Sequence, residues 1–586
     1  MDLTKPAPSH RLMVIALIVL TLLGSLPGLS SLQVIDRDEA RYAQASVQMR
    51  DSGDYVNIRF HDRERHKKPA GIYWLQTAAL KIASGPNARD IWVHRLPSVL
   101  AGLIAVLGLY WAGLSIFDRR GAFIAALLLA TSLLFIFESH IAKTDAALCA
   151  ASVWVFGGLL WLRSTQPQPT TETEAGAQFK RRKGYGLIIW AALGCAVIIK
   201  GPILPSILVV AIISVIIWDK LSGHTEHWWR PLLSPLGICL FGLIALPWYI
   251  MIFKLTDGAF FKTAIGSDLS PKITGGQEKH GAPPGFYLLT IFATFWPAAL
   301  FLPAGLAYGM KAARGQMKSS ISQSHISQFQ ARWLLAWALP FWIILELIPT
   351  KLTPYALPLF PALALLMAGA IMSIAQGHFP KTRRIGGAIF LIISIILVFV
   401  ILGGQAEYGT SHIAAYIVGI IIITAALATT AFTFKAKMKP ALIGLTITGL
   451  GLSGMTYGFI LPNLTDLRLA PRIASALDAN NIKLPRHGGP LIRSPHFTEP
   501  SLVYYLGSNI LLGSKATDLG SFPLQADHIW ILDMRQDSAK DIQDRLSHIA
   551  AHNGSCFTQQ SKIKGMNYSK GDEVELAIFS IGCDKP

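Results

Sequence analysis

The sequence predicts a polytopic α-helical membrane protein with about thirteen transmembrane helices, and composition gives the first reason. Of its 586 residues, 52% are hydrophobic and only 15% are charged. Soluble domains carry roughly 25% charged residues, so this chain lacks the charge that a large soluble surface requires. The second reason is a repeated pattern of long apolar segments, each separated from the next by a short polar one.

The apolar segments are each close to the ~20 residues that a helix needs to cross a bilayer. The first, residues 12–29, follows Lys5 and Arg11 and resembles a signal peptide. It is long enough to span, however, and has no A-x-A cleavage site, so we expect an uncleaved anchor. The other twelve predicted spans are residues 95–116, 121–139, 146–162, 185–199, 203–218, 234–254, 286–310, 332–348, 355–375, 386–404, 412–433 and 441–461.

The formal net charge of +18 would suit a nucleic-acid binder, but the distribution of that charge argues against one. The basic residues form short runs between apolar segments, whereas nucleic-acid binding needs a continuous basic face. A cytoplasmic N-terminus puts these runs on the inner side, as the positive-inside rule requires. The cytoplasmic loops are then 117–120, 163–184, 219–233, 311–331, 376–385 and 434–440. An odd number of spans leaves residues 462–586 outside.

The C-terminal segment, residues 462–586, is long enough for a small extracytoplasmic α/β domain with its own core. Apolar runs alternate in it with helical stretches such as 537–551, which is typical of mixed α and β structure. Residues 1–461 form the predicted membrane domain. Cys556 and Cys583 could form a disulfide if this segment lies in an oxidising compartment, and the sequence leaves that open.

The predicted outer loops 35–94, 140–145, 255–285 and 349–354 concentrate charged and aromatic residues near membrane level. Burying charge near lipid is costly unless the charge is paired, so such residues are candidates for function. The cytoplasmic loops contain no Walker-type Gly-Lys-Ser/Thr sequence, which leaves nothing to support an ATP-driven transporter.

The first outer loop is the richest, and its acidic start carries the main candidates. We expect amphipathic helices in the outer loops, the first of them over residues 38–48. A helix there places Asp38 on one face with Arg41 and Tyr42, at i+3 and i+4. A carboxylate beside a guanidinium suits a base that must stay ionised near a phosphate. A surface helix with a local ion pair is the alternative for this cluster taken alone.

Other outer positions repeat this pattern of charge near membrane level. They are Glu138, His140, Lys143 and Asp145, then Lys200, then Glu278, Lys279 and His280, and finally Lys351. Each lysine alone is more often a side chain that reaches from the membrane to water than a ligand-binding group. Gathered at one membrane face, these residues favour an anionic, membrane-held substrate.

These residues carry a resemblance to a known family. Asp38-Glu39-x-Arg41-Tyr42, followed by Lys68-Pro69 and Gly71-x-Tyr73-Trp74, resembles the first outer loop of the aminoarabinose transferases and protein-mannosyltransferase-like glycosyltransferases. The resemblance continues over nearly the whole chain. It includes Lys143-Thr144-Asp145, Lys200-Gly201-Pro202, Leu246-Pro247-Trp248-Tyr249, His280 with Pro283-Pro284, Phe295-Trp296-Pro297, Lys351-Leu352-x-x-Tyr355-x-x-Pro358 and Glu499-Pro500-Ser501-Leu502-x-Tyr504-Tyr505-x-Gly507.

The resemblance implies an enzyme of a bacterial inner membrane that takes a sugar from an undecaprenyl-phosphate carrier and modifies lipid A or another envelope glycoconjugate. Residues 1–461 would be the glycosyltransferase domain and 462–586 a periplasmic domain. Asp38 and Asp145 would be the catalytic carboxylates. The carrier phosphate would be held by Lys68, Arg41, Tyr42, Lys200 and Lys351. Secondary candidates are Asp36, which could share or replace the role of Asp38, and Glu39, Glu138, His280 and Tyr355.

One departure concerns a metal. The resemblance implies an acidic residue just before the phosphate-binding lysine, and with a later histidine it would hold a divalent cation. His280 matches that histidine, but Lys67 replaces the acidic residue and disfavours a cation there. No cofactor is therefore firmly predicted.

Three alternative functions remain. A protein O-glycosyltransferase is the nearest, because these motifs do not specify the acceptor. A lipid-linked sugar flippase would place charges near mid-membrane and show internal repeats, neither of which the sequence displays. A purely structural protein would leave the first-loop cluster without a purpose.

Overall fold

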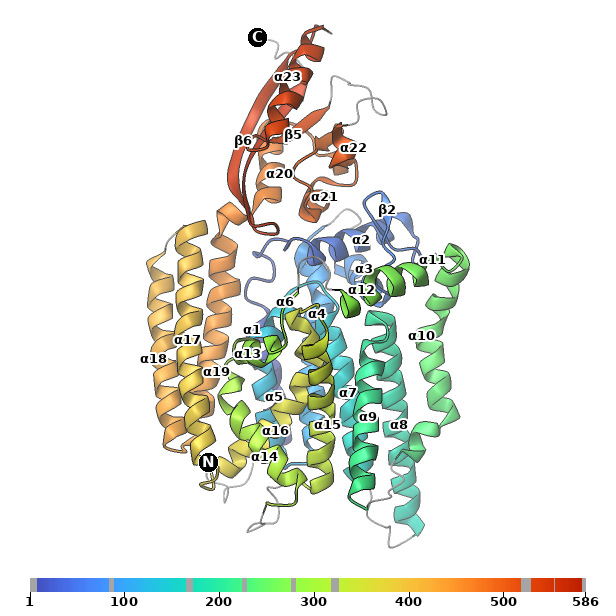
Figure 1. The fold of residues 1–586 in the computed structure, drawn as a ribbon, viewed down its shortest axis with the longest axis vertical. Coiled ribbons are helices and arrows are strands. Elements are labelled where there is room, and N and C mark those ends of the chain that lie inside the picture. The colour runs from blue at the N-terminus through green and yellow to red at the C-terminus, as the bar shows by residue number, and fades with distance from the viewer. Residues whose placement is uncertain are drawn as a thin grey trace.

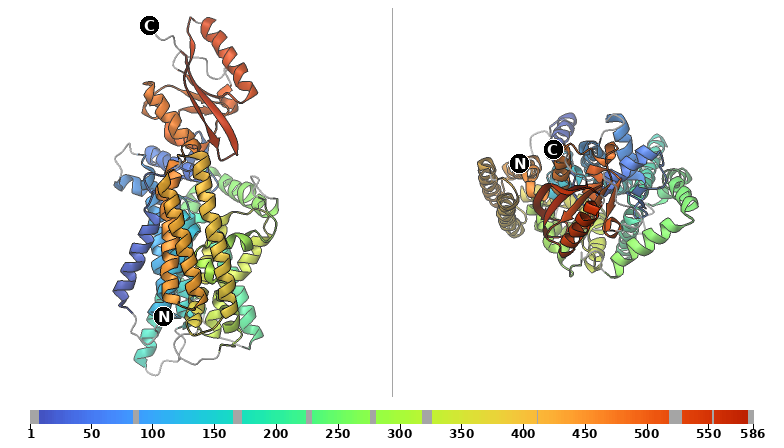
Figure 2. Two further views of the ribbon diagram at one scale, coloured as in Figure 1. Left: turned by 90° about the vertical axis from the view of Figure 1, so that its left-hand side faces the viewer. Right: turned by 90° about the horizontal axis from the view of Figure 1, so that it is seen from above.

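The computed structural model describes residues 8–83, 89–164, 172–223, 229–275, 281–317, 326–410, 412–517, 528–552 and 554–581. Long helices form a bundle, and a smaller segment that contains a β-sheet stands on one end of it (Figure 1). Seen from above, the sheet lies over the bundle (Figure 2). The chain is a multi-pass membrane protein.

Nine of the described helical segments are long and apolar enough to cross a membrane. They are α4 (Ile91–Gly113), α7 (Asp145–Ser164), the Lys180–Lys200 part of α8 (Glu172–Lys200), α9 (Ile203–Leu221), α10 (Pro235–Thr256), Thr353–Ile374 (η4 and α16), α17 (Pro380–Tyr408), α18 (Ile413–Phe434) and Met438–Asn463 (α19, η5 and η6). Two bent pairs could each make one further span: α5 (Arg119–Ala130) with α6 (Leu133–His140), and α13 (Phe286–Thr294) with the segment Ala298–Ala313, which comprises η3 and α14.

The predicted spans 12–29 and 332–348 correspond to α1 (His10–Ser25) and α15 (Gln328–Leu347). With 16 residues, α1 is shorter than the nine helices above, and α15 is not among them. The number of candidate spans in the described chain is therefore nine to eleven, and thirteen stays a prediction.

Burial separates the helices of the bundle into central and lipid-facing ones. The apolar stretch of Thr353–Ile374 is fully buried and that of α7 is 89% buried, whereas that of α10 is only 22% buried. Small residues allow α4 and α7 to approach closely, because a Cβ on Gly157 would come within 2.8 Å of the Ala112 Cβ. Close packing through glycine and alanine is typical of membrane helices, which gain little from the hydrophobic effect.

The first outer loop folds over the end of the bundle as two helices joined by a short hairpin. The helix expected over residues 38–48 is α2 (Asp38–Ser52), and it ends at Gly53, whose φ of 71° is left-handed. It is followed by β1 (Arg59–Phe60), β2 (Arg63–Glu64) and α3 (Gly71–Ala83). Most of α2 is buried, because it packs against α3 on one side and α21 (Pro500–Leu506) on the other.

The outer loop between α10 and α13 is also mostly helical. It contains α11 (Ala259–Phe261), the π-helical segment η2 (Lys262–Leu269) and α12 (Ser270–Thr274). In Figure 1 this loop crosses the outer end of the bundle below α2 and α3.

The C-terminal segment contains a five-stranded sheet with the strand order β4-β3-β5-β7-β6. The strands are β3 (Ile492–Ser494), β4 (Ile510–Leu512), β5 (Ile529–Asp533), β6 (Phe557–Asn567) and β7 (Asp572–Ile581). β3 pairs in parallel with β4 and β5, and β7 pairs antiparallel with β5 and β6. The helices α20 (Leu469–Ala479), α21 and α23 (Asp537–His552) pack with it around apolar cores. Cys556 takes part in a disulfide, whereas Cys583 lies outside the described residues.

Candidate active site

A charged cavity of about 160 Å³ lies between the predicted first outer loop, residues 35–94, and the helix ends that this loop covers. Its lining carries eight basic side chains and three carboxylates, from segments far apart in the sequence. They are Arg37, Arg41, Arg65, Lys67, Lys68, Lys143, Lys200 and Lys272, with Asp38, Asp145 and Asp268; Tyr42 and Tyr355 also line it. A site with this excess of positive charge attracts an anion.

The first turn of α2 supplies one wall of the cavity. Asp38 and Arg41 lie 3.9 Å apart at i and i+3, as predicted, and 56% of the Asp38 side chain is exposed. Arg65 lies over the ring of Tyr42, 5.4 Å from the ring centre, and its Nε donates to the Tyr73 hydroxyl at 3.1 Å. These contacts hold Arg65 beside α2, while the Asp38 carboxylate remains open to the cavity.

A second wall joins two outer loops through one carboxylate. Asp268 accepts from Lys68 Nζ at 3.1 Å and from Lys272 Nζ at 2.7 Å. Although burial raises the pKa of Asp268, the two lysines hold it below its usual value. Burial also holds the pKa of Lys68 below its usual value, although Asp268 opposes this shift.

Asp145, at the start of α7, lines the cavity and is only 4% exposed. Lys200, at the end of α8, forms an ion pair with it, and Lys143 Nζ lies 3.9 Å from its Oδ2. Lys143 also lies 3.4 Å from Glu138. Burial lowers the pKa of Lys143, but the carboxylates of Glu138 and Asp145 more than offset this effect and raise it above its usual value.

Most of the residues predicted for the site meet here. Asp38, Arg41, Tyr42, Lys68, Asp145, Lys200 and Tyr355 all line the cavity. Lys200 also lies over the ring of Tyr355, 5.9 Å from its centre. Glu138 is fully buried and does not line the cavity, but it forms an ion pair with Lys143, which does.

Two predicted residues have structural partners instead of a place in the lining. Glu39 is buried and forms an ion pair with Arg95 at 2.8 Å, and it accepts the backbone N–H groups of Ile35 and Ala142. Lys351 Nζ donates to the carbonyl oxygens of residues 345, 346 and 348, at the end of α15. The structure thus does not bring either side chain into the cavity.

Asp36 also points away from the charged cavity. Its Oδ1 accepts the backbone N–H of Ser501 at 2.8 Å, and burial raises its pKa to about 6. His280 lies outside the described residues. Among the residues that the structure describes, no group of three His, Cys, Asp or Glu side chains could hold a metal ion. Lys67, the residue that departs from the family pattern, lines the cavity.

Sequence reasoning missed Asp268 as a site residue. It lies in the predicted outer loop 255–285, four residues before Lys272, and that spacing forms an ion pair on a helix. Arg37, Arg65 and Lys272 lie in the same predicted outer loops but had been given no role, and Lys143 had been named only as part of the charge near membrane level. Their common signal is positive charge in a predicted outer loop.

Residues 11–256 match the model of the dolichyl-phosphate-mannose-protein mannosyltransferase family. The undecaprenyl phosphate-α-4-amino-4-deoxy-L-arabinose arabinosyl transferase of Edwardsiella ictaluri (strain 93-146) is 26% identical over 66% of this chain and 65% of its own. The enzyme of the same name from Erwinia tasmaniensis is 25% identical over 64% and 62%. These matches support a place for the chain among the aminoarabinose transferases and protein-mannosyltransferase-like membrane glycosyltransferases.

Solved structures show that the family fold extends over the whole chain. ArnT from Cupriavidus metallidurans in the apo state covers 97% of both chains with a TM-score of 0.68 and 18% identity. The same protein bound to undecaprenyl phosphate gives a TM-score of 0.67. The sequence match to the curated family members, in contrast, spans less than two thirds of their length.

Proposed function

We propose that this protein transfers a sugar from an undecaprenyl-phosphate carrier to an acceptor in the bacterial envelope. The observation that carries this proposal is the charged cavity, in which eight basic side chains surround three carboxylates. Fixed cations stabilise the negative charge that grows on a departing phosphate. The ArnT structure solved with undecaprenyl phosphate supports this choice of carrier.

In this proposal Lys68, Lys200 and Arg41 hold the carrier phosphate, with Tyr42 and Tyr355 beside it. The acceptor oxygen bonds to the anomeric carbon as the bond from that carbon to the phosphate oxygen breaks. The electron pair stays on the lipid phosphate, and Asp38 takes the acceptor proton as a general base. Asp38 suits this role because its carboxylate is exposed and lies next to Arg41. Asp145 would orient the buried lysines and the sugar.

The same proposal assigns the topology. The helices α1 and α15 join the nine candidate helices and the two bent pairs as thirteen spans of a bacterial inner membrane. The N-terminus is then cytoplasmic, and residues 462–586 form a periplasmic α/β domain above the cavity. Charge gathered at the outer end of the bundle favours this arrangement over a flippase, which would need polar groups near mid-membrane.

The acceptor is lipid A or a related glycolipid in the leading form of the proposal, and a protein hydroxyl in the alternative. A divalent metal is disfavoured in either form because Lys67 stands where the family pattern has an acidic residue, and the lysines and arginines of the cavity themselves supply positive charge.

The test measures transfer of labelled sugar from total polyprenyl-phosphate-sugar lipids in membranes that contain equal amounts of inserted protein. Asp38→Ala and Lys68→Ala should each lose transfer. Asp51→Ala is the matched control for Asp38, because Asp51 lies on the same helix with its side chain 49% exposed. Lys81→Ala is the control for Lys68, because Lys81, on α3, lies over the ring of Tyr55 and does not line the cavity. Full transfer by the two cavity variants would refute the site, and the labelled product would identify the acceptor.

A further inference from the structure

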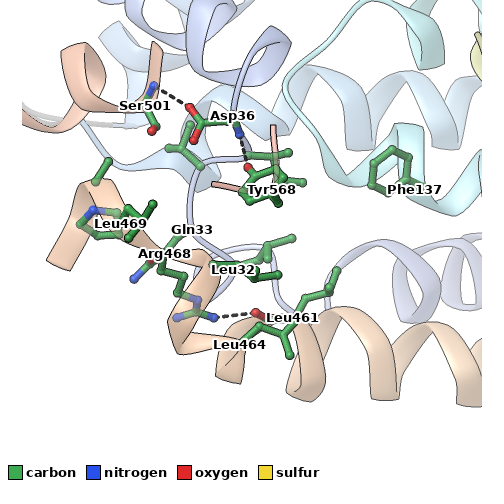
Figure 3. A pocket seen from close by; sticks show the side chains of 15 residues that line it. Leu32, Gln33, Asp36, Phe137, Leu461, Leu464, Arg468, Leu469, Ser501 and Tyr568 are labelled. Carbon is green, nitrogen blue, oxygen red and sulfur yellow. Dashed lines mark hydrogen bonds between the residues drawn. The ribbon is translucent and has the colours of Figure 1, made fainter. Parts of the chain in front are cut away.

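The short turn that leads into α2 is held by the distant C-terminal segment. The backbone N–H of Asp36 donates to the Tyr568 hydroxyl at 2.5 Å, and Arg37 Nη2 donates to the Ser569 carbonyl oxygen at 2.5 Å. Ser501 N–H donates to the Asp36 carboxylate. Figure 3 shows Asp36 between Ser501 and Tyr568, with dashed lines to both.

This turn has a conformation that the chain would not choose by itself. Arg37 has φ 68° and ψ −94°, a region that side chains other than glycine rarely adopt. Arg37 is also the N-cap of α2, and its side chain makes no capping hydrogen bond to the helix. Such a conformation persists only when its surroundings hold it. Asp38 is the next residue, so the backbone conformation of Arg37 fixes the position from which the Asp38 side chain extends.

Open space lies on both sides of the turn. Arg37 and Asp38 line the charged cavity, whereas Asp36 lines a second, mostly apolar cavity of about 270 Å³ together with Tyr568 and Arg468. Figure 3 shows this second cavity. Val34 and Ala40 pack into a small apolar cluster on either side of the turn, while Asp36 and Arg37 themselves are held by their hydrogen bonds to the C-terminal segment.

The contacts come from a part of the C-terminal segment that is itself well held. Tyr568 and Ser569 form the tip of the hairpin between β6 and β7, and Gly571 N–H donates to the Asn567 carbonyl oxygen at 2.8 Å. The Asn567 side chain is buried and donates to Glu499 at 3.1 Å, just before α21. The tip is thus connected to both the sheet and α21.

We propose that the tip of the β6–β7 hairpin positions Asp38 by holding the turn at Asp36 and Arg37. The C-terminal segment is then a positioning element of the active site, and Tyr568 is a positioning residue that does not itself touch the substrate. This inference rests on the proposed function for the role of Asp38. It predicts an effect on turnover more than on carrier binding, because Lys68 and Lys200 lie on other segments, and Arg41 lies a turn further along α2, where the helix packs against α3 and α21.

The test compares Tyr568→Phe, which removes the hydroxyl and keeps the ring, with Ser569→Ala. The second variant is the matched control, because Arg37 bonds to the Ser569 carbonyl oxygen and not to its side chain. Hydrogen exchange of residues 35–42 reports the turn directly and needs no activity. We expect faster exchange there in Tyr568→Phe, with unchanged exchange in strands β5 and β7, and wild-type exchange in Ser569→Ala.

Kinetics then separate positioning from binding. With extracted polyprenyl-phosphate-sugar lipids as donor, Tyr568→Phe should lower kcat by about 3- to 10-fold, the effect of one net hydrogen bond. Its Kd for undecaprenyl phosphate should stay within about 2-fold of wild type, because Lys68 and Lys200 lie on other segments and Arg41 is held by the packing of α2. Unchanged exchange of residues 35–42 would overturn the inference, as would an equal loss of undecaprenyl-phosphate binding. If wild type transfers no sugar, the proposed function fails, whereas the exchange comparison still decides whether the tip holds the turn.

Discussion

Lys68 Nζ lies 3.1 Å from the Asp268 carboxylate, so the first outer loop and the loop after α10 are joined by an ion pair inside the charged cavity. The Lys68 side chain is 27% exposed and that of Asp268 is 6% exposed. An incoming phosphate would have to share Lys68 with this carboxylate. Asp268 therefore both favours the protonated form of Lys68 and competes with the ligand for it.

Asp268→Asn should shift the pH dependence of undecaprenyl-phosphate binding. Lys68 must be protonated to bind phosphate, so binding weakens as the pH rises through its pKa. Burial already lowers that pKa and Asp268 opposes the shift, so the loss of Asp268 moves the decline to lower pH. At the acidic end of the titration, where the protonated form of Lys68 is most favoured, the variant should bind at least as tightly as wild type. Titrations of undecaprenyl-phosphate binding between pH 6 and 10 measure this shift.

Asp257→Asn is the control, because Asp257 is exposed in the same loop and has a left-handed φ of 45°, which asparagine tolerates. A wild-type pH profile in Asp268→Asn would contradict the prediction.

Asp145 and Lys200 should behave as a coupled pair in a double-mutant cycle. Their side chains are only 5% and 8% exposed, so either single variant leaves a buried charge with a lost partner. That typically costs about 3–5 kcal/mol, and Lys143 will moderate the effect for Asp145. We expect Asp145→Asn and Lys200→Met each to lower Tm, and the double variant to lower it by clearly less than their sum. The exposed pair Arg535 and Glu573 provides a reference cycle with little coupling. Additive losses at Asp145 and Lys200 would argue against the pairing.

Substitutions of the adjacent carboxylates Glu39 and Asp38 should have different effects, one on stability and the other on transfer. Glu39→Gln leaves Arg95 without its carboxylate in a fully buried site, so we expect poor insertion and a much lower Tm. Asp38→Asn changes an exposed side chain and should keep the wild-type Tm. Transfer should fall by about 100-fold or more, which is the contribution that a general base typically makes. Expression level, thermal unfolding and transfer are measured on the same preparations. A stable Glu39→Gln protein would show that the Arg95 pair is not needed for folding.

Lys351→Met should weaken the fold and leave carrier binding unchanged. Its Nζ donates to three carbonyl oxygens at the end of α15, groups that the helix itself cannot satisfy. Loss of these bonds should cost about 1–3 kcal/mol. The Kd for undecaprenyl phosphate should change by less than about 2-fold, whereas Lys68→Met should raise it by about 10-fold or more, as loss of a charged hydrogen bond implies. Equal effects of the two variants on Kd would restore Lys351 to the binding site.

Particular residues show which features of the site could be predicted from sequence patterns and which could not. The helix from Asp38 and its pairing with Arg41 were predictable, because an i, i+3 relation is local. The different fates of Asp38 and Glu39 were not, since consecutive helix residues point about 100° apart and only the position of Arg95 decides which of the two is buried. Asp268 escaped notice because its partner Lys68 is 200 residues away. Lys351 was misleading for a different reason: its motif resembles that of a binding residue, but nearby carbonyl oxygens at the end of α15 take its charge.

The sequence by itself determined that this is a multi-pass membrane protein and where most of its helices lie, because hydropathy and charge act over neighbouring residues. The tertiary structure decided which charged side chains share a cavity, and that the hairpin tip at Tyr568 touches the turn before Asp38. Those contacts join segments up to 532 residues apart. Their physical cause is the cost of leaving a charge or a polar group unpaired away from water, and which partner satisfies it depends on how the whole chain packs.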